Sequence, residues 1–144
     1  MVYSTKSFSF SNSQSANICP SFVTSVGRIT AVAEICESAI PVAGDVRDFE
    51  YAEAVAEVAQ KHGGADYLIA CAGGYEARCC NSMVPFYEQP KEVLDWGIDV
   101  NLKGPFYFAH AVLKQMREQQ GGLIVNIGSI TGQEGDGYGM DYPT

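Results

Sequence analysis

The last residues of the chain, LIVNIGSITGQEGDGYGMDYPT (123–144), hold the side chains with the most evident capacity for chemistry. An apolar run of strand type leads into Gly128 and Ser129, and Tyr142 follows that serine by thirteen residues. A phenol can donate a proton to a carbonyl oxygen or accept one from an alcohol, and a hydroxyl can hydrogen-bond the same oxygen. A phenol with an ordinary pKa of about 10 is a poor base at neutral pH, so it needs help from other groups. This segment therefore indicates part of an active site.

Asn101 is a third candidate, because it lies in a segment of helical pattern and Pro105 follows four residues later. Proline has no N–H, so the Asn101 carbonyl loses its helical partner. A carbonyl freed in this way needs water or another donor. Two interpretations follow: Asn101 holds a water beside a reaction site, or the helix has an ordinary proline kink with a solvated asparagine.

The elements that position these residues alternate along the chain. Three nearly continuous apolar runs predict strands buried on both faces of a parallel sheet: IPVAGDV (40–46), YLIACAG (67–73) and LIVNIGS (123–129). Two helical patterns separate them, one that starts at the N-cap Asp48 and stops at Gly63-Gly64, and one from about 90 to 119. This order predicts right-handed crossovers and an α/β fold with a doubly wound parallel sheet, Rossmann-like and incomplete.

Small or acidic residues follow the three strands, namely Asp45-Val46, Cys71 to Gly74, and Gly128-Ser129. Ligands of open parallel sheets bind beyond the carboxyl ends of the strands, so a flat ligand has room to lie across this rim. The alternative for each glycine taken singly is that it only ends a strand and turns the chain.

The motifs GDVRD, LIACAGG, DVNLKGPF and VNIGSITG, with Tyr142 at the expected spacing from Ser129, resemble those of the short-chain dehydrogenase/reductase family over roughly residues 30–144. The resemblance implies an oxidoreductase that transfers hydride between NAD or NADP and a secondary alcohol or ketone, which would be a small-molecule substrate. It implies that Asn101, Ser129 and Tyr142 are catalytic. It also implies that Asp45 and Val46 border the adenine, and that Ala72 and Gly73 support the cofactor ribose side. In the family the long helix builds a dimer interface, so a homo-oligomer through residues 90–119 is expected.

Three departures from the family pattern bear on function. Residues 1–39 contain one glycine, Gly27, so the glycine-rich turn that binds the cofactor pyrophosphate is missing. Ala70 replaces an asparagine, and the sequence stops two residues before the position of the family's catalytic lysine. We therefore expect a truncated family member that is inactive as given. The alternative function is a non-catalytic fragment that keeps part of the sheet and the dimerisation helix.

Composition excludes several other classes. The net charge is −8 with scattered basic residues, which argues against nucleic acid and anionic membranes, and no apolar run is long enough to span a membrane. The odd number of cysteines, without a C-x-x-C pair, argues against a metal site and a disulfide framework, and favours a cytoplasmic location. The serine-rich residues 1–27 are expected to be a disordered or non-native leader, and a transit peptide is the alternative. Residues 28–144 then form the partial dinucleotide-binding domain.

Overall fold

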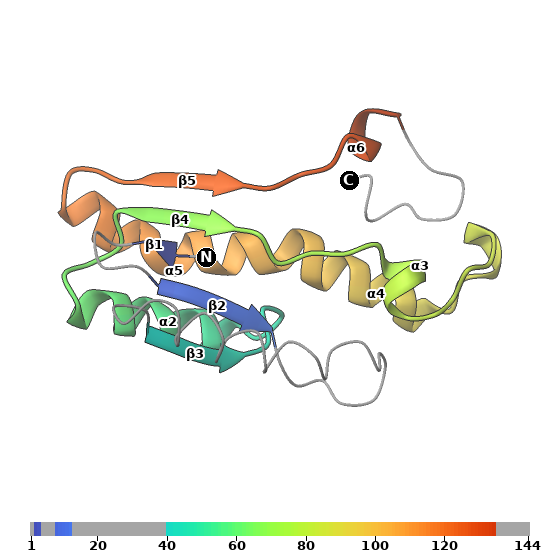
Figure 1. Cartoon of the computed structure of the whole chain (residues 1–144), viewed down its shortest axis with the longest axis horizontal. Helices are drawn as coiled ribbons and strands as arrows, with labels where there is room; N and C mark the ends of the chain where they lie inside the picture. Colours follow the sequence, from blue (N-terminus) through green and yellow to red (C-terminus); the bar gives the residue numbers. More distant parts are fainter. Residues whose placement is uncertain (1, 4–7, 13–39, 135–144) are drawn as a thin grey trace.

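The computed structural model describes residues 2–3, 8–12 and 40–134, and these form an α/β arrangement (Figure 1). Its strands are β1 (Val2–Tyr3), β2 (Phe8–Asn12), β3 (Ile40–Gly44), β4 (Tyr67–Ala70) and β5 (Leu123–Asn126). Its helical segments are α2 (Phe49–Lys61), α3 (Glu76–Cys79), the 3₁₀ turn η2 (Phe86–Glu88), α4 (Lys91–Ile98), the π-helical η3 (Asp99–Lys103), α5 (Gly104–Glu118) and α6 (Thr131–Glu134).

The strands form a three-stranded sheet in the order β1-β4-β5 and a two-stranded sheet of β2 and β3. The pair β4–β5 is parallel, as the sequence predicts. The pair β2–β3 is also parallel, although no strand was expected at β2, and the two residues of β1 run antiparallel to β4. Both β1 and β2 fall within residues 1–27, where we expected a disordered or non-native leader. The remainder of that range lies outside the described residues, so the boundary at residue 27 stays a prediction.

Helix α2 follows the sequence prediction closely. The Asp48 carboxylate caps it by accepting a hydrogen bond of 2.9 Å from the Glu50 N–H, and its last turn ends before Gly63, whose φ is +107°. An N-cap carboxylate satisfies one of the N–H groups that a helix leaves without partners, and glycine adopts positive φ without steric cost. These two signals fix both ends of the helix.

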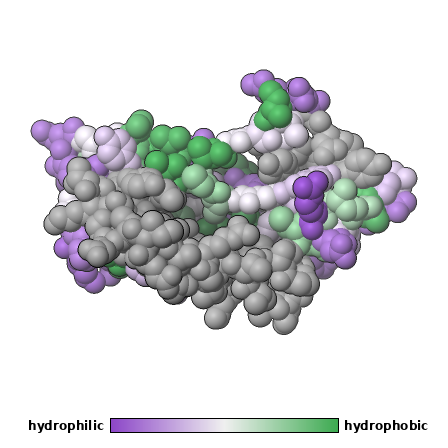
Figure 2. Space-filling model, viewed as in Figure 1, coloured by the Kyte–Doolittle hydropathy of each residue, from purple (hydrophilic) through white to green (hydrophobic). Residues whose placement is uncertain are grey.

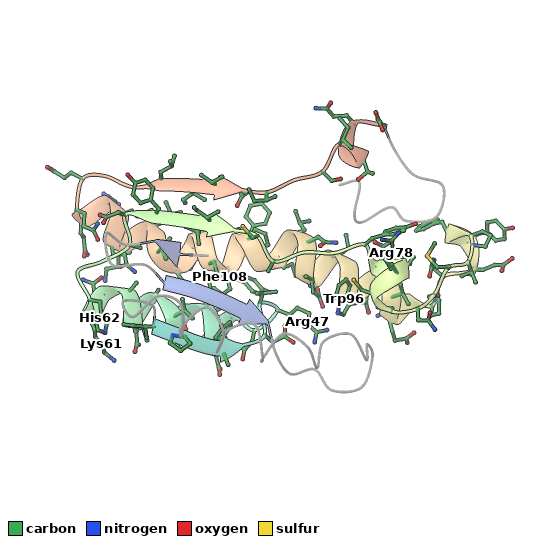
Figure 3. All side chains as sticks on the ribbon, in the orientation of Figure 1. Arg47, Lys61, His62, Arg78, Trp96 and Phe108 are labelled. Carbon is green, nitrogen blue, oxygen red and sulfur yellow. The ribbon has the colours of Figure 1, made fainter. Side chains whose placement is uncertain are left out.

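The core lies between the sheet and one layer made of α2 and α5. Helix α2 buries Tyr51, Val55 and Ala59, and α5 buries Phe108 and Val112. The rings of Tyr51 and Phe108 meet edge to face with centroids 5.7 Å apart. Figure 3 shows Phe108 between α5 and the strands. Helix α2 joins β3 of the two-stranded sheet to β4, and the α4–α5 segment joins β4 to β5 within the three-stranded sheet.

A buried glutamine, Gln115, joins the two helices. Its Oε1 atom accepts a hydrogen bond of 3.1 Å from the N–H of Ala65, and its Nε2 atom donates one of 3.2 Å to the carbonyl of Ala56. The side chain thus ties α5 both to α2 and to the turn that leads into β4. A buried polar group of this kind is stabilising only while both bonds are made.

The expectation of strands buried on both faces is wrong for the described part of the sheet. On the face opposite α2 and α5, Tyr67 of β4 is 46% exposed and Leu123 of β5 is 52% exposed. Figure 2 shows apolar surface over this part of the sheet. One face of β4 and β5 is therefore packed and the other is open.

Candidate active site at the carboxyl edge of the sheet

The arrowheads of β3, β4 and β5 point in the same direction, so the residues that follow them meet at one edge of the molecule (Figure 1). Strand β3 ends directly before Asp45, β4 ends before Cys71, and β5 ends three residues before Ser129. The parallel order thus collects the three predicted rim segments at the place where open α/β sheets bind ligands.

The side chain of Asn101 joins the long helix to the rim. Its Oδ1 atom accepts a hydrogen bond of 2.9 Å from the Gly74 N–H, and its Nδ2 atom donates one of 3.0 Å to the Gly74 carbonyl. The two bonds together fix which end of the amide is oxygen, because the flipped amide would place donor against donor. The interpretation of Asn101 as a solvated residue at an ordinary kink is therefore wrong.

The helix geometry explains why Asn101 reaches Gly74. The predicted continuous helix is interrupted by the π segment η3, in which the Gly104 N–H donates to the carbonyl of Asp99, five residues earlier. Pro105 follows directly and supplies no N–H, so the α-helical bond to the Asn101 carbonyl is lost. Wider turns of this kind often occur at functional sites.

Two glycines leave room for this arrangement. A Cβ on Gly73 would lie 3.1 Å from Asn101 Oδ1, and a Cβ on Gly74 would lie 2.8 Å from the sulfur of Cys79 and 3.6 Å from the ring of Trp96. Trp96 is buried in α4 (Figure 3). The rim loop after β4 therefore packs on α3 and α4, while Ala72 and Gly73 themselves are exposed toward solvent.

The carboxylate of Asp45 is held by a residue that the sequence analysis did not single out. Arg47 donates from its main-chain N–H to Oδ1 (3.0 Å), from Nε to both oxygens (3.0 Å each) and from Nη2 to Oδ2 (2.6 Å). The hydrogen bonds that Arg47 donates to Asp45 raise the pKa of Arg47 above its ordinary value, against the opposing effect of burial. The signal was present in the spacing of GDVRD, where an arginine follows an aspartate by two residues.

Val46 points away from the rim. Its side chain is buried and packs against the helix at Gly104, where an added Cβ would lie 3.3 Å from Val46 Cγ2. Any ligand beside this position would therefore meet the Val46 main chain and the Asp45–Arg47 pair rather than the valine side chain.

Ser129 is half-buried at the turn before α6. Its Oγ atom accepts hydrogen bonds from the Thr131 hydroxyl (2.9 Å) and from the Thr131 N–H (3.3 Å). A serine oxygen has two acceptor sites and one donor proton, so two accepted bonds leave the proton for another acceptor. Tyr142 lies outside the described residues.

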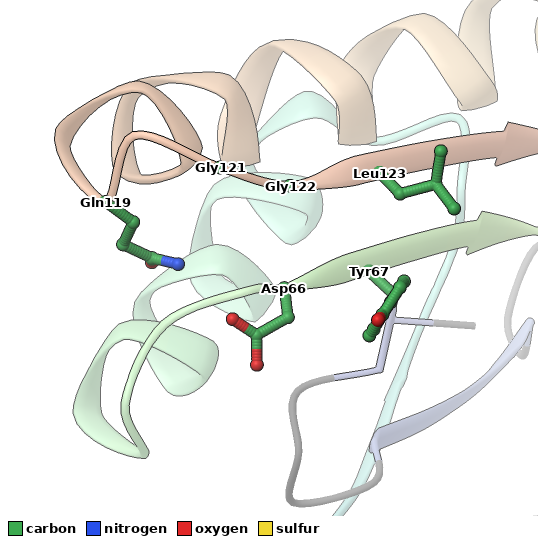
Figure 4. A pocket seen from close by; sticks show the side chains of 6 residues that line it. All are labelled: Asp66, Tyr67, Gln119, Gly121, Gly122 and Leu123. Atoms are coloured by element: carbon green, nitrogen blue, oxygen red, sulfur yellow. The ribbon is translucent and has the colours of Figure 1, made fainter.

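A cavity of about 620 Å³ lies at the opposite end of the sheet (Figure 4). It is lined by Asp66, Tyr67, Gln119, Gly121, Gly122 and Leu123. These residues precede or begin β4 and β5, and none is a predicted site residue. The carboxyl edge therefore remains the better candidate, because the described site residues Asp45, Ala72, Gly73 and Ser129 follow strands there and Asn101 bonds to Gly74 in the loop after β4.

Within residues 2–3, 8–12 and 40–134 no three His, Cys, Asp or Glu side chains are grouped so as to hold a metal ion. In the same part of the chain, no helix is long and apolar enough to cross a membrane.

Comparison with known proteins identifies the family. The sequence model of the short chain dehydrogenases matches residues 19–144, which is most of the chain. The chain belongs to the short-chain dehydrogenase family. Its incomplete sheet is accordingly a part of the Rossmann-like fold of that family of oxidoreductases.

Relatives of this short-chain dehydrogenase chain are longer than the chain itself. An uncharacterized oxidoreductase of Staphylococcus aureus (strain USA300) is 38% identical over 93 residues, 62% of this chain and 37% of the relative. A 2-dehydro-3-deoxy-L-rhamnonate dehydrogenase (NAD(+)) of Sphingomonas sp. (strain SKA58) is 38% identical over 96 residues, 66% of this chain and 36% of that enzyme. The chain thus spans little more than a third of the length of these relatives.

Solved structures also match most of this chain with less than half of their own length. A variant of actinorhodin polyketide ketoreductase with NADPH superposes with a TM-score of 0.72 at 27% identity, over 95% of this chain and 48% of the other. A short-chain dehydrogenase from Streptomyces avermitilis superposes with a TM-score of 0.65 at 30% identity, over 78% of this chain and 40% of the other.

Proposed function

We propose that this chain carries part of the site of an NAD(P)-dependent cytoplasmic oxidoreductase that interconverts a secondary alcohol and a ketone. The observation that carries the proposal is the pair of hydrogen bonds from Asn101 to Gly74. They tie the DVNLKGPF segment of the long helix to the glycine rim after β4, and so connect two of the motifs at the edge where a ligand is expected.

The rim suits part of a nicotinamide dinucleotide. Exposed Ala72 and Gly73 allow close approach of a ribose, and the Asp45 carboxylate, which is paired with the guanidinium of Arg47, is an acceptor for an amino group of adenine. When bound, such a cofactor would supply or accept the hydride. Residues 1–39 contain one glycine, Gly27, and so do not supply the glycine-rich turn that would bind the cofactor pyrophosphate.

In this proposal the chain's own residues handle the substrate oxygen and its proton. The Ser129 hydroxyl, which accepts two bonds from Thr131, directs its remaining proton to the substrate oxygen and holds it in place. Tyr142 donates a proton to that oxygen in reduction and accepts it in oxidation. The Asn101 carbonyl, which Pro105 cannot bond, holds a water that passes the proton onward.

Cofactor titration is the first test. We expect dissociation constants for NADH and NADPH near the millimolar range, corresponding to about −4 kcal/mol, because the N–H groups of a glycine-rich turn are missing. Fluorescence energy transfer from Trp96, the single tryptophan of the chain, to the bound reduced nicotinamide would be the signal that measures binding. A low-micromolar constant would show that another segment replaces the missing turn.

Turnover at millimolar dinucleotide, with a panel of ketones and secondary alcohols, is the second test. Tyr142→Phe should lower turnover by about 10²–10⁴-fold with little change in cofactor affinity. Tyr138→Phe is the matched control and should cost much less. Equal losses of turnover for the two variants, or a larger loss for Tyr138→Phe, would show that Tyr142 is not the acid/base residue.

The second candidate is a non-catalytic fragment that associates through its long helix. The single glycine in residues 1–39 favours it, as do Phe106 and Leu113, which are exposed on α5 by 65% and 51%. Absence of turnover at saturating dinucleotide, together with weaker self-association of a Phe106→Glu variant, would support this function over the first.

A further inference from the structure

Both oxygens of the Asp45 carboxylate accept hydrogen bonds from one residue. Oδ1 accepts from the main-chain N–H and the Nε–H of Arg47, and Oδ2 accepts from the same Nε–H and from Nη2. A carboxylate has about four acceptor sites in all. In this structure Arg47 therefore uses the acceptor capacity of Asp45.

The pair is also largely withdrawn from solvent. The side chains of Asp45 and Arg47 are 16% and 20% exposed. Figure 3 shows Arg47 beyond the end of β3, at the carboxyl edge where a ligand is expected. A donor that arrives at this edge reaches an oxygen of Asp45 only if the guanidinium moves.

The amino group of adenine is such a donor. It needs an acceptor, and a guanidinium carries N–H donors alone, so Arg47 cannot serve as its partner. The amino group and the Arg47 guanidinium therefore compete for the same oxygens of Asp45.

Main-chain bonds hold the carboxylate in place without the guanidinium. The Arg47 N–H donates to Asp45 Oδ1 (3.0 Å), and the Asp48 N–H donates to the Asp45 carbonyl (3.0 Å). Both bonds remain when the Arg47 side chain swings away. Its departure thus frees Oδ2 and leaves the direction of the carboxylate unchanged.

A second carboxylate lies within electrostatic reach of the guanidinium. The hydrogen bonds and the charge of Asp45 raise the pKa of Arg47, and the charge of Asp99 raises it as well. Asp99 belongs to the π segment and is bonded to Lys103 (2.6 Å). A displaced Arg47 consequently keeps a negative charge nearby, which lowers the cost of leaving Asp45.

We propose that Arg47 controls how strongly this rim binds adenine: its guanidinium occupies the Asp45 oxygen that the adenine amino group requires, and adenine binds by displacing it. The inference rests on the proposed dinucleotide site and adds the residue that opposes it. Arg47 should act against the amino group and not against the rest of the ring.

A pair of neutral nucleosides tests this selectivity. Adenosine carries the amino group, whereas purine riboside lacks only that group. Arg47→Met keeps a side chain of similar length without donors, so NMR titration should show adenosine affinity raised by roughly 3–10-fold, since a hydrogen bond to a charged acceptor is no longer contested. The affinity for purine riboside should not change.

Two further variants show whether Arg47 acts through Asp45. Lys103→Met removes a cation from the other ion pair of this edge and should leave adenosine binding unchanged. In an Asp45→Ala background the gain from Arg47→Met should vanish, because the contested acceptor is missing. If Arg47→Met does not fold, Arg47→Lys replaces the fork by a single ammonium and should give a smaller gain in adenosine affinity.

The wild-type chain provides a readout without any substitution. The Nε–H of Arg47 donates to both Asp45 oxygens, so its NMR signal reports the pair directly. Saturating adenosine should shift this signal, and saturating purine riboside should leave it in place.

The outcomes separate this inference from the proposed function. Absence of adenosine binding in every form of the chain would overturn both together. Equal adenosine affinity of wild type and Arg47→Met, or an Arg47 Nε–H signal that adenosine does not move, would overturn the inference alone. An equal gain for purine riboside would do the same, because Arg47 would then obstruct the ring and not the amino group.

Discussion

Replacement of Asn101 by alanine should lower the free energy of unfolding by about 1–3 kcal/mol, since two hydrogen bonds to Gly74 are lost and each contributes a net 0.5–1.5 kcal/mol. In a chain of this size that corresponds to a fall in Tm of about 4–12 °C. Hydrogen exchange adds a local measurement: the Gly74 amide should lose protection in the variant, because Asn101 Oδ1 is its acceptor.

Asn101→Asp is the informative companion variant. It keeps an oxygen that accepts from the Gly74 N–H, but at neutral pH a carboxylate oxygen faces the Gly74 carbonyl where the amide donated. Protonation restores a donor, so folding raises the pKa of the new carboxyl above the ordinary value of about 3.9. The deficit relative to wild type should therefore shrink as the pH falls toward 4 and be largest near neutrality.

A specific result for each variant would refute the role of the Asn101 hydrogen bonds. If Asn101→Ala unfolded within about 1 °C of wild type and the Gly74 amide kept its protection, the two bonds would contribute nothing. If the deficit of Asn101→Asp did not change with pH, the Nδ2 bond to the carbonyl would be absent.

Three further outcomes are expected. Gly44→Ala should destabilise by about 1–3 kcal/mol in urea titration, because its Cβ would lie 2.2 Å from the Tyr51 ring, whereas Gly121→Ala meets nothing within 4 Å and should be neutral. Gln115→Leu should cost about 1–3 kcal/mol by the same assay, since it leaves the buried Ala65 N–H without its acceptor; a neutral result would contradict this. Burial, and then the charge of a nearby carboxylate, raises the pKa of Tyr51 far above its ordinary value. The unfolded chain alone then releases this proton above about pH 10, so the stability advantage of wild type over Tyr51→Phe should shrink there, and a constant difference would refute it.

Local signals predicted the elements that make the site. The Asp48 cap and the Gly63-Gly64 stop specify α2, and three apolar runs specify β3, β4 and β5, because capping and hydrophobic periodicity act within a few residues of sequence. The motif resemblance predicted the family. It also named the candidate site residues, of which Asn101 is brought to Gly74 by hydrogen bonds, while the roles of all of them stay predictions.

Long-range and side-chain features were not predictable in the same way. The bond between Asn101 and Gly74 joins residues 27 positions apart, and only the packing of α4 on the rim brings them together. The loss of the i+4 bond at Pro105 was predicted, but its outcome, a π turn rather than a kink, depends on which alternative the surrounding contacts stabilise. Likewise, apolar composition predicted two covered faces for the strands, although a sequence run does not specify what covers each face.

The π turn at Asp99–Lys103 also sets the phase of the long helix. Buried residues recur at every fourth position from α4 to α5: Trp96, Val100, Gly104, Phe108 and Val112. At 3.6 residues per turn, each step of four overshoots a full rotation by about 40°, so an unbroken α-helix would turn Val112 about 160° away from Trp96. The wider turn offsets part of this rotation, so the buried positions before and after it follow two separate α-helical periods. Deleting a single residue from the turn would rotate one half against the other by about 100° and carry Trp96 out of the core, so this segment should resist changes in length that a surface loop would accept.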